Sequence, residues 1–545
     1  MMPVITFSKK DFESLVGRKL SINDLKDLLD YAKAELEVQE GDNISVKYND
    51  TNQPYLWCPE GLAILFKGLL GKETGIPKLA LSSSGGQIVV DRSVKKVRPF
   101  IAGFVAKGPP LSDYLIKLLI QLQEKLADSF GRHRDNIAIG VYPADKINFS
   151  VAYKTVKPDS LKFLPLDAER ELSLAQILEQ HPKGKEYSWI LAKEKEYPIL
   201  VDAKNQVLSF PPIINSQTTG RLSVGDKNIF FEATGKSSSG VDLCAVIVAY
   251  ALSMRGYTIH PVTVKDEKTK TTPLLALEQW KLNKVLIQKR LGLELSEKEI
   301  GNHLTRFRYE YDGKNVKIPP YRQDIMHEYD IIEDIGIAYG YNNITPLKIH
   351  THTRGAALPE IQMINSLRDL CVGLGCQEVF SQILSDPNLM WDKMGLKKQS
   401  MIEIENFTSA TYSCVRTLIL PILLSMLSQN RQAEAPYKVF EEGLVTLREG
   451  TDYHDEHHLA IVSSHATANF TEIRQIVEYL LDRLGISYTI KPEEHSSFIS
   501  GRCAAAFVGN KKVAFFGEIH PAVLQNFNID LPTVGMEMNL SLILA

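Results

Sequence analysis

The stretch that decides the fold of this chain is residues 319–346, which read PPYRQDIMHEYDIIEDIGIAYGYNNITP. Its two leading prolines favour an extended entry, and Asp324 could cap the helix that we expect to follow. On that helix Asp330, Glu333 and Asp334 stand at positions i, i+3 and i+4, so their side chains project from one face. The segment therefore predicts a packed, isoleucine-rich helix that carries three carboxylates side by side.

Spacing alone leaves two interpretations of this carboxylate cluster open. Like charges at this spacing repel by about 0.2–0.5 kcal/mol per pair, which a hard cation between them would offset. Oxygen ligands without His or Cys favour Mg²⁺ over zinc. The alternative is a solvated acidic face that pairs with Arg322 or Lys348.

The same stretch resembles the hallmark of the B5 domain of phenylalanyl–tRNA synthetase β subunits, which runs roughly R-x-D-I-x-x-x-x-D-x-x-E-[DE]-I-x-x-x-Y-G-Y-x-x-I-P. The matching positions are Arg322, Asp324, Ile325, Asp330, Glu333, Asp334, Ile335, Tyr339, Gly340, Tyr341, Ile344 and Pro346. Thr345, inserted before the final proline, is the one departure. The resemblance implies a magnesium ion at a subunit boundary, and the family's four acidic positions fall on Asp324, Asp330, Glu333 and Asp334.

The rest of the chain is similar to this family in the same order. The segments that carry the similarity are LQEKLADSFGRHRDNIAIGVYPADKI (122–147), VLSFPPIINSQTTGRLSVGDKNIFFEATG (207–235), WKLNKVLIQKRLGLELSEKEIGNHLTRFRYEY (280–311), VRTLILPILLSMLSQNR (415–431), KVFEEG (438–443) and FFGEIHPAVLQNF (515–527). The length, and the lack of the additional terminal domains of bacterial β chains, resemble the archaeal and eukaryotic form.

The resemblance implies a multidomain α+β chain with four parts. These are an N-terminal α/β domain (1–110), a B3/B4 editing-like domain (111–264), the B5 domain with its magnesium site (273–348) and a catalytic-like core (355–545). The last would be a degenerate class II synthetase core, with an antiparallel sheet flanked by helices. From the residues themselves we expect helices at 21–34, 111–130 and 241–255, strands at 44–48 and 87–90, and a charged linker at 265–272.

Composition excludes several other classes of protein. The chain has 545 residues, which suggests three to five domains, and its net charge of −3 confines any nucleic-acid contact to a local patch. Its six cysteines form no C-x-x-C pair, and no apolar run approaches the roughly 20 residues that span a bilayer. We therefore expect a cytoplasmic protein without a membrane anchor.

The C-terminal core lacks part of what aminoacyl-adenylate chemistry requires. A class II site needs one arginine in its second motif and another near its end, because cations must stabilise the departing pyrophosphate. Arg416 and Arg431 lie near the first position, but no arginine follows Arg502. We expect this core to have kept a packing role, with ATP and phenylalanine bound by an α subunit in an (αβ)₂ tetramer that charges tRNA(Phe).

The resemblance also implies a second activity, hydrolysis of tyrosine mischarged onto the phenylalanine tRNA. A phenylalanine pocket only weakly rejects a ligand that adds a hydroxyl, so a second site is useful. The candidate residues are Asn215, Glu232 and Thr234 beside Pro211–Pro212, with Asn215 binding polar groups of the amino acid and Glu232 orienting a water. The alternative is that Asn215 finishes a turn and Glu232 lies on a strand edge.

Two other functions compete with this interpretation. The chain could be a nucleic-acid-binding module of another assembly, or a free-standing deacylase that acts on mischarged tRNA. A histidine cluster at His454, His457, His458 and His465 also suggests zinc, but it lacks the H-E-x-x-H pattern, and we expect three of these residues on a turn before a strand.

Overall fold

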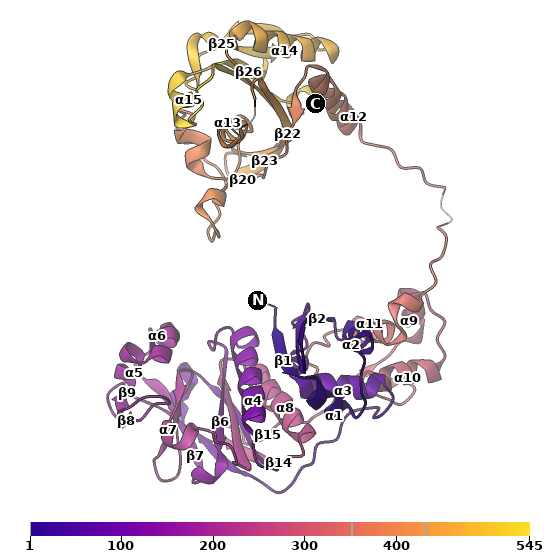
Figure 1. Ribbon diagram of the computed structural model, residues 1–545, viewed down its shortest axis with the longest axis vertical. Coiled ribbons are helices and arrows are strands. Elements are labelled where there is room, and N and C mark those ends of the chain that lie inside the picture. The colour runs from indigo at the N-terminus through magenta and orange to yellow at the C-terminus, as the bar shows by residue number, and fades with distance from the viewer. Residues whose placement is uncertain (1, 350–351, 431, 433, 545) are drawn as a thin grey trace. The chain divides into compact units, whose positions relative to one another are not determined.

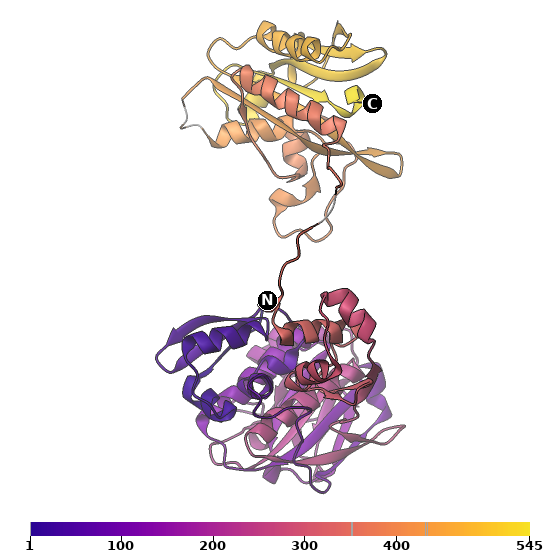
Figure 2. The same ribbon diagram turned by 90° about the vertical axis from the view of Figure 1, so that its right-hand side faces the viewer.

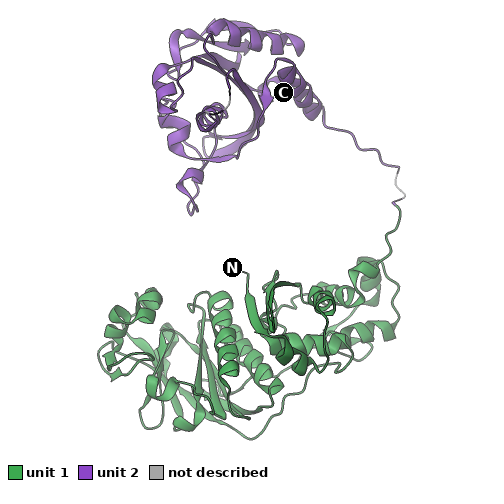
Figure 3. Ribbon diagram, in the orientation of Figure 1, with its two compact units in different colours: residues 1–348 green, residues 349–545 purple. Residues whose placement is uncertain are grey.

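The computed structural model describes residues 2–349, 352–430, 432 and 434–544. The chain divides into two compact units, Met1–Lys348 and Ile349–Ala545 (Figure 3). In the described residues no helix is both long and apolar enough to cross a lipid bilayer.

The first part of unit 1 is a small α/β layer. A three-stranded sheet in the order β1-β3-β2 packs with three helices, and the elements are β1 (Val4–Ser8), α1 (Lys9–Val16), α2 (Ile22–Asp30), β2 (Ala34–Glu40), β3 (Asn43–Tyr48) and α3 (Pro59–Leu69). Ser21 starts α2 with a reciprocal capping box to Asp24, which satisfies two backbone donors at once. The strand expected at 44–48 is present, and the helix expected at 21–34 is present but ends at Asp30, because β2 begins at Ala34.

A ten-stranded sheet forms the centre of unit 1 (Figure 1). Its order is β12-β11-β10-β7-β4-β14-β5-β13-β6, with β15 paired to β14. The strands are β4 (Gly86–Val90), β5 (Phe100–Lys107), β6 (Ile137–Pro143), β7 (Val151–Val156), β10 (Tyr197–Val201), β11 (Val207–Phe210), β12 (Ile214–Asn215), β13 (Asn228–Gly235), β14 (Thr258–Lys265) and β15 (Lys270–Thr272). Only the β4 pairings with β14 and β7 are parallel.

This sheet crosses the domain boundary that the sequence suggested at residue 110. Strands β4 and β5 precede that boundary, yet β5 lies between β14 and β13. The expected linker at 265–272 is also wrong, because β15 turns back onto β14 as a hairpin. The Thr272 hydroxyl donates to the Gly103 carbonyl at 2.7 Å, which fixes the end of this hairpin in the core.

Helices cover this sheet, and one of them also forms part of the wall of a pocket. On one face lie α4 (Asp113–Lys125), which continues as a π-helical turn (Leu126–Phe130), and α8 (Ser238–Met254). At the β10–β12 end lie β8 (Lys162–Phe163), β9 (Leu172–Ser173), α5 (Leu174–Gln180), α6 (Pro182–Tyr187) and α7 (Gln217–Gly220). The helices expected at 111–130 and 241–255 are confirmed.

The last part of unit 1 contains the segment quoted at the outset. Its elements are β16 (Glu278–Lys281), α9 (Lys284–Leu291), α10 (Glu297–Arg306), β17 (Glu310–Tyr311), β18 (Asn315–Ile318) and α11 (Glu328–Tyr339), and its sheet has the order β16-β18-β17. Helix α11 begins after His327, which is the residue that caps it. The expectation that Asp324 caps this helix is wrong, because Asp324 pairs with Arg322 instead.

Unit 2 is a seven-stranded sheet with helices on both faces. The order is β19-β22-β23-β27-β26-β25-β24, and all pairings except β19 with β22 are antiparallel. Its strands are β19 (Gln377–Glu378), β22 (Tyr437–Glu449), β23 (Asp452–Ser464), β24 (Thr489–Pro492), β25 (Phe498–Val508), β26 (Lys511–Ile519) and β27 (Thr533–Asn539), and a separate pair joins β20 (Leu384–Ser385) to β21 (Cys414–Val415).

Alternation along β23 explains why both faces of this sheet are covered. Leu459 and Ile461 pack under α12 (Pro359–Gly373) and α14 (Phe470–Arg483), whereas Ala460 and Val462 pack against α13 (Leu420–Gln429). Figure 2 shows α12 lying across the strands. The remaining helices are α15 (Pro521–Asn526) and α16 (Ser541–Leu544).

Candidate functional site

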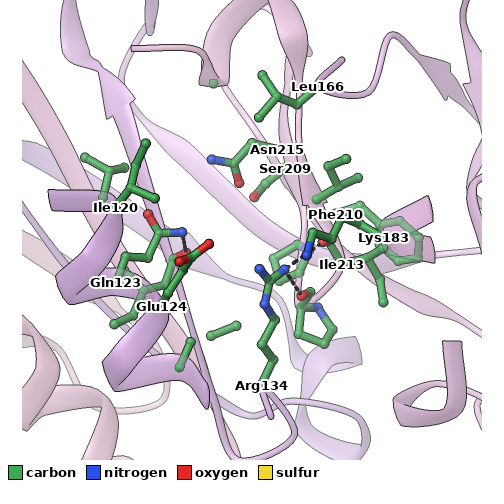
Figure 4. A pocket seen from close by; sticks show the side chains of 18 of the residues that line it. Ile120, Gln123, Glu124, Arg134, Leu166, Lys183, Ser209, Phe210, Ile213 and Asn215 are labelled. Carbon is green, nitrogen blue, oxygen red and sulfur yellow. Dashed lines mark hydrogen bonds between the residues drawn. The ribbon is translucent and has the colours of Figure 1, made fainter. Parts of the chain in front are cut away.

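A pocket of about 520 Å³ lies where the two ends of the ten-stranded sheet approach each other (Figure 4). Helix α4 and strand β6 form one wall, and the segment from β11 through β12 forms the other. The polar residues that line it are Gln123, Glu124, Arg134, Asp167, His181, Lys183, Ser209, Asn215, Arg221 and Glu232. The pocket thus combines an apolar body with a limited set of polar groups, as ligand sites commonly do.

Glu232 forms the buried end of this pocket. Its side chain comes from β13, is 2% exposed, and accepts a hydrogen bond of 2.9 Å on Oε1 from the Tyr142 phenol. Its second oxygen, Oε2, is buried with no partner among the described residues. Burial raises the pKa of Glu232 to about 7. A buried carboxylate oxygen without a partner is costly, so this atom is suited to receive a hydroxyl from a ligand.

A glycine makes room for this arrangement. A Cβ at Gly140, on the neighbouring strand β6, would lie 2.1 Å from the Tyr142 hydroxyl and 2.4 Å from Glu232 Oε1. Any side chain at this position would displace the Tyr142–Glu232 pair. The buried end of the pocket is therefore shaped by the absence of a side chain at residue 140.

Asn215 stands on the opposite wall, at the end of β12. Its Oδ1 lies 3.5 Å from the Tyr142 hydroxyl, and Figure 4 shows its amide beside Ser209. Gly220 packs behind it, since a Cβ there would come within 2.7 Å of Asn215 Cβ. The structure therefore brings the predicted residues Asn215 and Glu232 to the same pocket.

Thr234, the third predicted residue, does not line this pocket. It lies two residues beyond Glu232 on β13, is fully buried, and accepts a 3.1 Å hydrogen bond on Oγ1 from Arg98 Nε. The prediction that Thr234 belongs to the wall of the pocket is therefore corrected. At this residue β13 already lies beyond the end of the pocket.

Sequence reasoning missed Arg134, Gln123 and Ser209. Arg134 donates from Nη1 to the Ile213 carbonyl at 3.0 Å, and its guanidinium lies 4.3 Å from the centre of the Tyr187 ring. Gln123 donates to the Ile139 carbonyl at 2.8 Å. Ser209 lies inside the quoted segment 207–235, two residues before Pro211–Pro212, and this position was the one signal available for it.

The four carboxylates of the quoted stretch are not brought together. Arg322 binds Asp324 through two hydrogen bonds of 2.7 Å and binds Asp334 at 2.8 Å, and all three side chains are at most 5% exposed. Tyr309 also donates to Asp334. Burial raises the pKa of Asp334, and the two carboxylates hold the pKa of Arg322 well above its usual value although burial opposes this.

The other two carboxylates have separate roles. Asp330 accepts hydrogen bonds from the Met326 and His327 backbone amides, both at 2.8 Å, and Glu333 pairs with Lys33 at 3.2 Å with half its side chain exposed. Across the described residues no group of three or more His, Cys, Asp or Glu side chains is arranged to hold a metal ion. As they stand, the four acidic residues do not fit a magnesium site built by this chain alone.

In unit 2 the arginine expected near a phosphate site is committed to an internal ion pair. Arg416 is 2% exposed and donates to Glu441 at 2.6 Å, to the Ser381 hydroxyl at 3.0 Å and to the Leu444 carbonyl at 2.8 Å. The second arginine expected there, Arg431, lies outside the described residues. The guanidinium of Arg416 is therefore not free to bind a phosphate.

The three histidines expected on a turn, His454, His457 and His458, lie on β23, and His465 follows this strand and pairs with Glu472 at 2.8 Å. His458 bridges Glu537 at 2.8 Å and Glu456 at 3.3 Å, and these carboxylates raise its pKa to about 9 although burial opposes the shift. Glu537 also accepts the backbone amides of Ile419 and Leu420 at the start of α13. His457 pairs separately with Glu442.

Comparison with known proteins identifies the family. The model of the phenylalanyl tRNA synthetase beta chain CLM domain matches residues 345–540, and that of the tRNA synthetase B5 domain matches residues 280–341. A phenylalanine–tRNA ligase beta subunit from Thermococcus sibiricus is 38% identical over 551 residues, covering 98% of both chains. The chain belongs to the family of phenylalanyl-tRNA synthetase β subunits of archaeal type.

Two further relatives agree with this membership. The ligase β subunit from Archaeoglobus fulgidus is 36% identical and covers 99% of this chain and 98% of its own length. The crystal structure of an N-terminal fragment of the phenylalanyl-tRNA synthetase β subunit from Pyrococcus horikoshii superposes with a TM-score of 0.60 at 39% identity, covering 62% of this chain and all of the fragment. The β-subunit family thus accounts for the full length, with a mixed α/β multidomain fold.

Proposed function

We propose that this chain is the β subunit of an (αβ)₂ ligase in the cytoplasm that attaches phenylalanine to tRNA(Phe) at the expense of ATP. Relatives named β subunit match it over 98% of its length, which supports a role inside a complex. The commitment of Arg416 to Glu441, and the absence of any arginine after Arg502, support a degenerate class II core in unit 2. On this proposal ATP and phenylalanine bind to the α subunit.

We further propose that the pocket of unit 1 hydrolyses tyrosine from mischarged tRNA. The observation that carries this proposal is the unpaired, buried Oε2 of Glu232 at the closed end of the pocket. A tyrosyl side chain that enters ring first can donate its phenolic hydroxyl to this oxygen. A phenylalanyl side chain leaves the oxygen unpaired, which disfavours its binding by about 1–3 kcal/mol.

This geometry changes the role that we assign to Glu232. Its side chain is 2% exposed and bound to the Tyr142 phenol, so we assign it recognition of the tyrosyl hydroxyl instead of orientation of the attacking water. Asn215, on the facing wall, remains the candidate to bind the polar groups of the amino acid. In the reaction a water attacks the ester carbonyl and the ribose oxygen leaves, so tyrosine and free tRNA are released.

No step of this proposal passes through the magnesium ion that the resemblance implies, because Asp324 and Asp334 are bound to Arg322. We keep the domain limit at 348–355 as part of the proposal, but the limit expected at 264 moves past β15, which pairs with β14 in the same sheet. A free-standing deacylase or an unrelated nucleic-acid-binding module would not need unit 2, which is the half that matches the β-chain CLM family.

The test is deacylation of Tyr-tRNA(Phe) and Phe-tRNA(Phe) by the αβ complex. Glu232→Ala should reduce the preference for tyrosine over phenylalanine by about tenfold or more, and Asn215→Ala should lower kcat/KM for both. Glu171→Gln, an exposed carboxylate of the same unit, is the matched control and should leave both rates unchanged. Wild-type rates in the Glu232 and Asn215 variants would remove these residues from the site.

A further inference from the structure

Arg98 is a buried arginine that connects β13 to the loop before β6 and does not itself line the pocket. It is 1% exposed. Its Nε and Nη2 donate to the side chain and carbonyl oxygens of Thr234 at 3.1 and 2.7 Å, and its Nη1 donates to the Asp135 carbonyl at 2.9 Å. One rigid guanidinium therefore joins β13, which carries Glu232, to the loop at residues 131–136.

That loop has an unfavourable backbone conformation. Arg132, His133 and Arg134 have φ values of 52°, 51° and 67°, in the left-handed region that residues other than glycine rarely adopt. Such residues persist only when their surroundings hold them in place, and they gather at functional sites. The loop is supported by its own backbone hydrogen bonds, among them those from the His133 and Arg134 amides to the Asp128 and Ala127 carbonyls at 2.8 and 2.9 Å. The Lys236 amide, just after β13, also donates to the Asn136 carbonyl at 2.9 Å.

The loop in turn places Arg134 at the pocket. From there the Arg134 guanidinium donates to the Ile213 carbonyl in the opposite wall, as Figure 4 shows. One set of hydrogen bonds thus runs from Thr234 through Arg98 to Asp135 and another from Arg134 to Ile213, and the Arg134–Asp135 peptide bond joins the two sets. Lys236 adds an ion pair to the Asp135 side chain on the same loop.

We propose that Arg98 is a positioning residue for hydrolysis in this pocket, because it holds the Arg134 loop in register with the strand that carries Glu232. The inference rests on the proposed deacylase function. Lysine keeps the positive charge of arginine but cannot donate hydrogen bonds in three fixed directions, so it cannot make all three contacts of the Arg98 guanidinium. The chain of contacts therefore requires the shape of the guanidinium and not only its charge.

A purely structural role for Arg98 is the competing explanation, and Arg255 offers a matched control. Arg255 is also a forked, mostly buried arginine of unit 1, and it binds Asp11 and Glu60. Neither Asp11 nor Glu60 lines the pocket. Arg98→Lys and Arg255→Lys therefore compare the same chemical change at a linked and an unlinked position.

The experiment uses the αβ complex with Tyr-tRNA(Phe) as substrate. Arg98→Lys should raise KM for deacylation about tenfold, from the loss of one or two charge-assisted hydrogen bonds, while Arg255→Lys leaves KM unchanged. Thr234→Val, which removes only the Nε contact, should change KM in the same direction by less. Phenylalanine charging by each variant complex reports whether it is folded.

Hydrogen exchange of the backbone amides at 128–136 gives a second readout that does not depend on catalysis. Arg98→Lys and Thr234→Val should speed exchange there, and Arg255→Lys should not. A wild-type KM with unchanged exchange in Arg98→Lys, or an equal KM increase in Arg255→Lys, would overturn the inference. If the wild-type complex fails to deacylate Tyr-tRNA, the proposed function is lost, and faster loop exchange would still support the link through Arg98.

Discussion

Removing the positive charge of Arg322 should destabilise the end of unit 1 strongly. Its guanidinium is paired with both Asp324 and Asp334, and the three side chains are 2–5% exposed. Arg322→Met leaves two buried carboxylates without a cation, and breaking a buried pair in this way costs about 3–5 kcal/mol. The corresponding exposed contact, Arg290 on Tyr329, is worth about 1 kcal/mol or less, so Arg290→Met is the control.

The assay is hydrogen exchange of α11 amides in the full chain, with and without magnesium. Loss of about 3–5 kcal/mol corresponds to a fall in protection of roughly two to three and a half orders of magnitude where exchange follows opening of this region. The triple variant Arg322→Met, Asp324→Asn, Asp334→Asn should recover part of the loss, because no buried charge remains unpaired. Magnesium should not change α11 protection in the wild type.

Two results would refute this reasoning. Unchanged exchange of α11 in Arg322→Met would mean that the buried pair is not what holds the helix in place. Magnesium-dependent protection of the wild type, lost when Asp324 or Asp334 is replaced by Asn, would mean that these carboxylates bind a metal rather than Arg322.

Three further predictions concern titration and the second unit. His458, whose pKa is about 9, should stabilise unit 2 fully below about pH 6.5 and progressively less as pH rises through 9. The unfolding midpoint of the wild type, measured between pH 6 and 10, should fall along this range, and that of His458→Gln should not. Arg416→Met should lower the free energy of unfolding of unit 2, measured in urea, by about 3–5 kcal/mol. The rate of ATP–pyrophosphate exchange per intact αβ complex should stay at the wild-type value. Loss of exchange in a complex that is still assembled would place Arg416 in an active site. The preference for Tyr-tRNA over Phe-tRNA in deacylation should rise as Glu232 ionises near pH 7, because a carboxylate is a stronger acceptor than a carboxylic acid, and a pH-independent preference would contradict this role.

Local elements were predictable from the sequence because they depend on neighbouring residues. The helical spacing of 21–34 and 111–130 and the long apolar run of 241–255 identified helices that the structure contains, although the first of them ends at Asp30. The ten-stranded sheet could not be foreseen in the same way. Its β4 and β5 strands pair with β14, which lies roughly 150 to 180 residues later in the chain, and the hydrophobic pattern within a strand carries no information about such a partner.

The candidate site shows the same division. Asn215 and Glu232 could be named from their segments, but Thr234 follows the same alternation as Glu232 and was not distinguishable from it until the length of the pocket wall was known. Spacing could not decide whether Asp324 and Asp334 bind a metal or Arg322, since both arrangements need clustered carboxylates. The position of Arg134 at the pocket depends on a left-handed backbone conformation that no residue type in its loop predicts.

The measurement that tests the central claim most directly is phenylalanine charging of tRNA(Phe) by this chain alone, by the α subunit alone and by the two together after co-purification. We predict that the chains elute at equal stoichiometry and that only the pair forms Phe-tRNA. Charging by this chain alone, or elution without an α-type partner, would contradict the account of a β subunit whose own core has lost the chemistry.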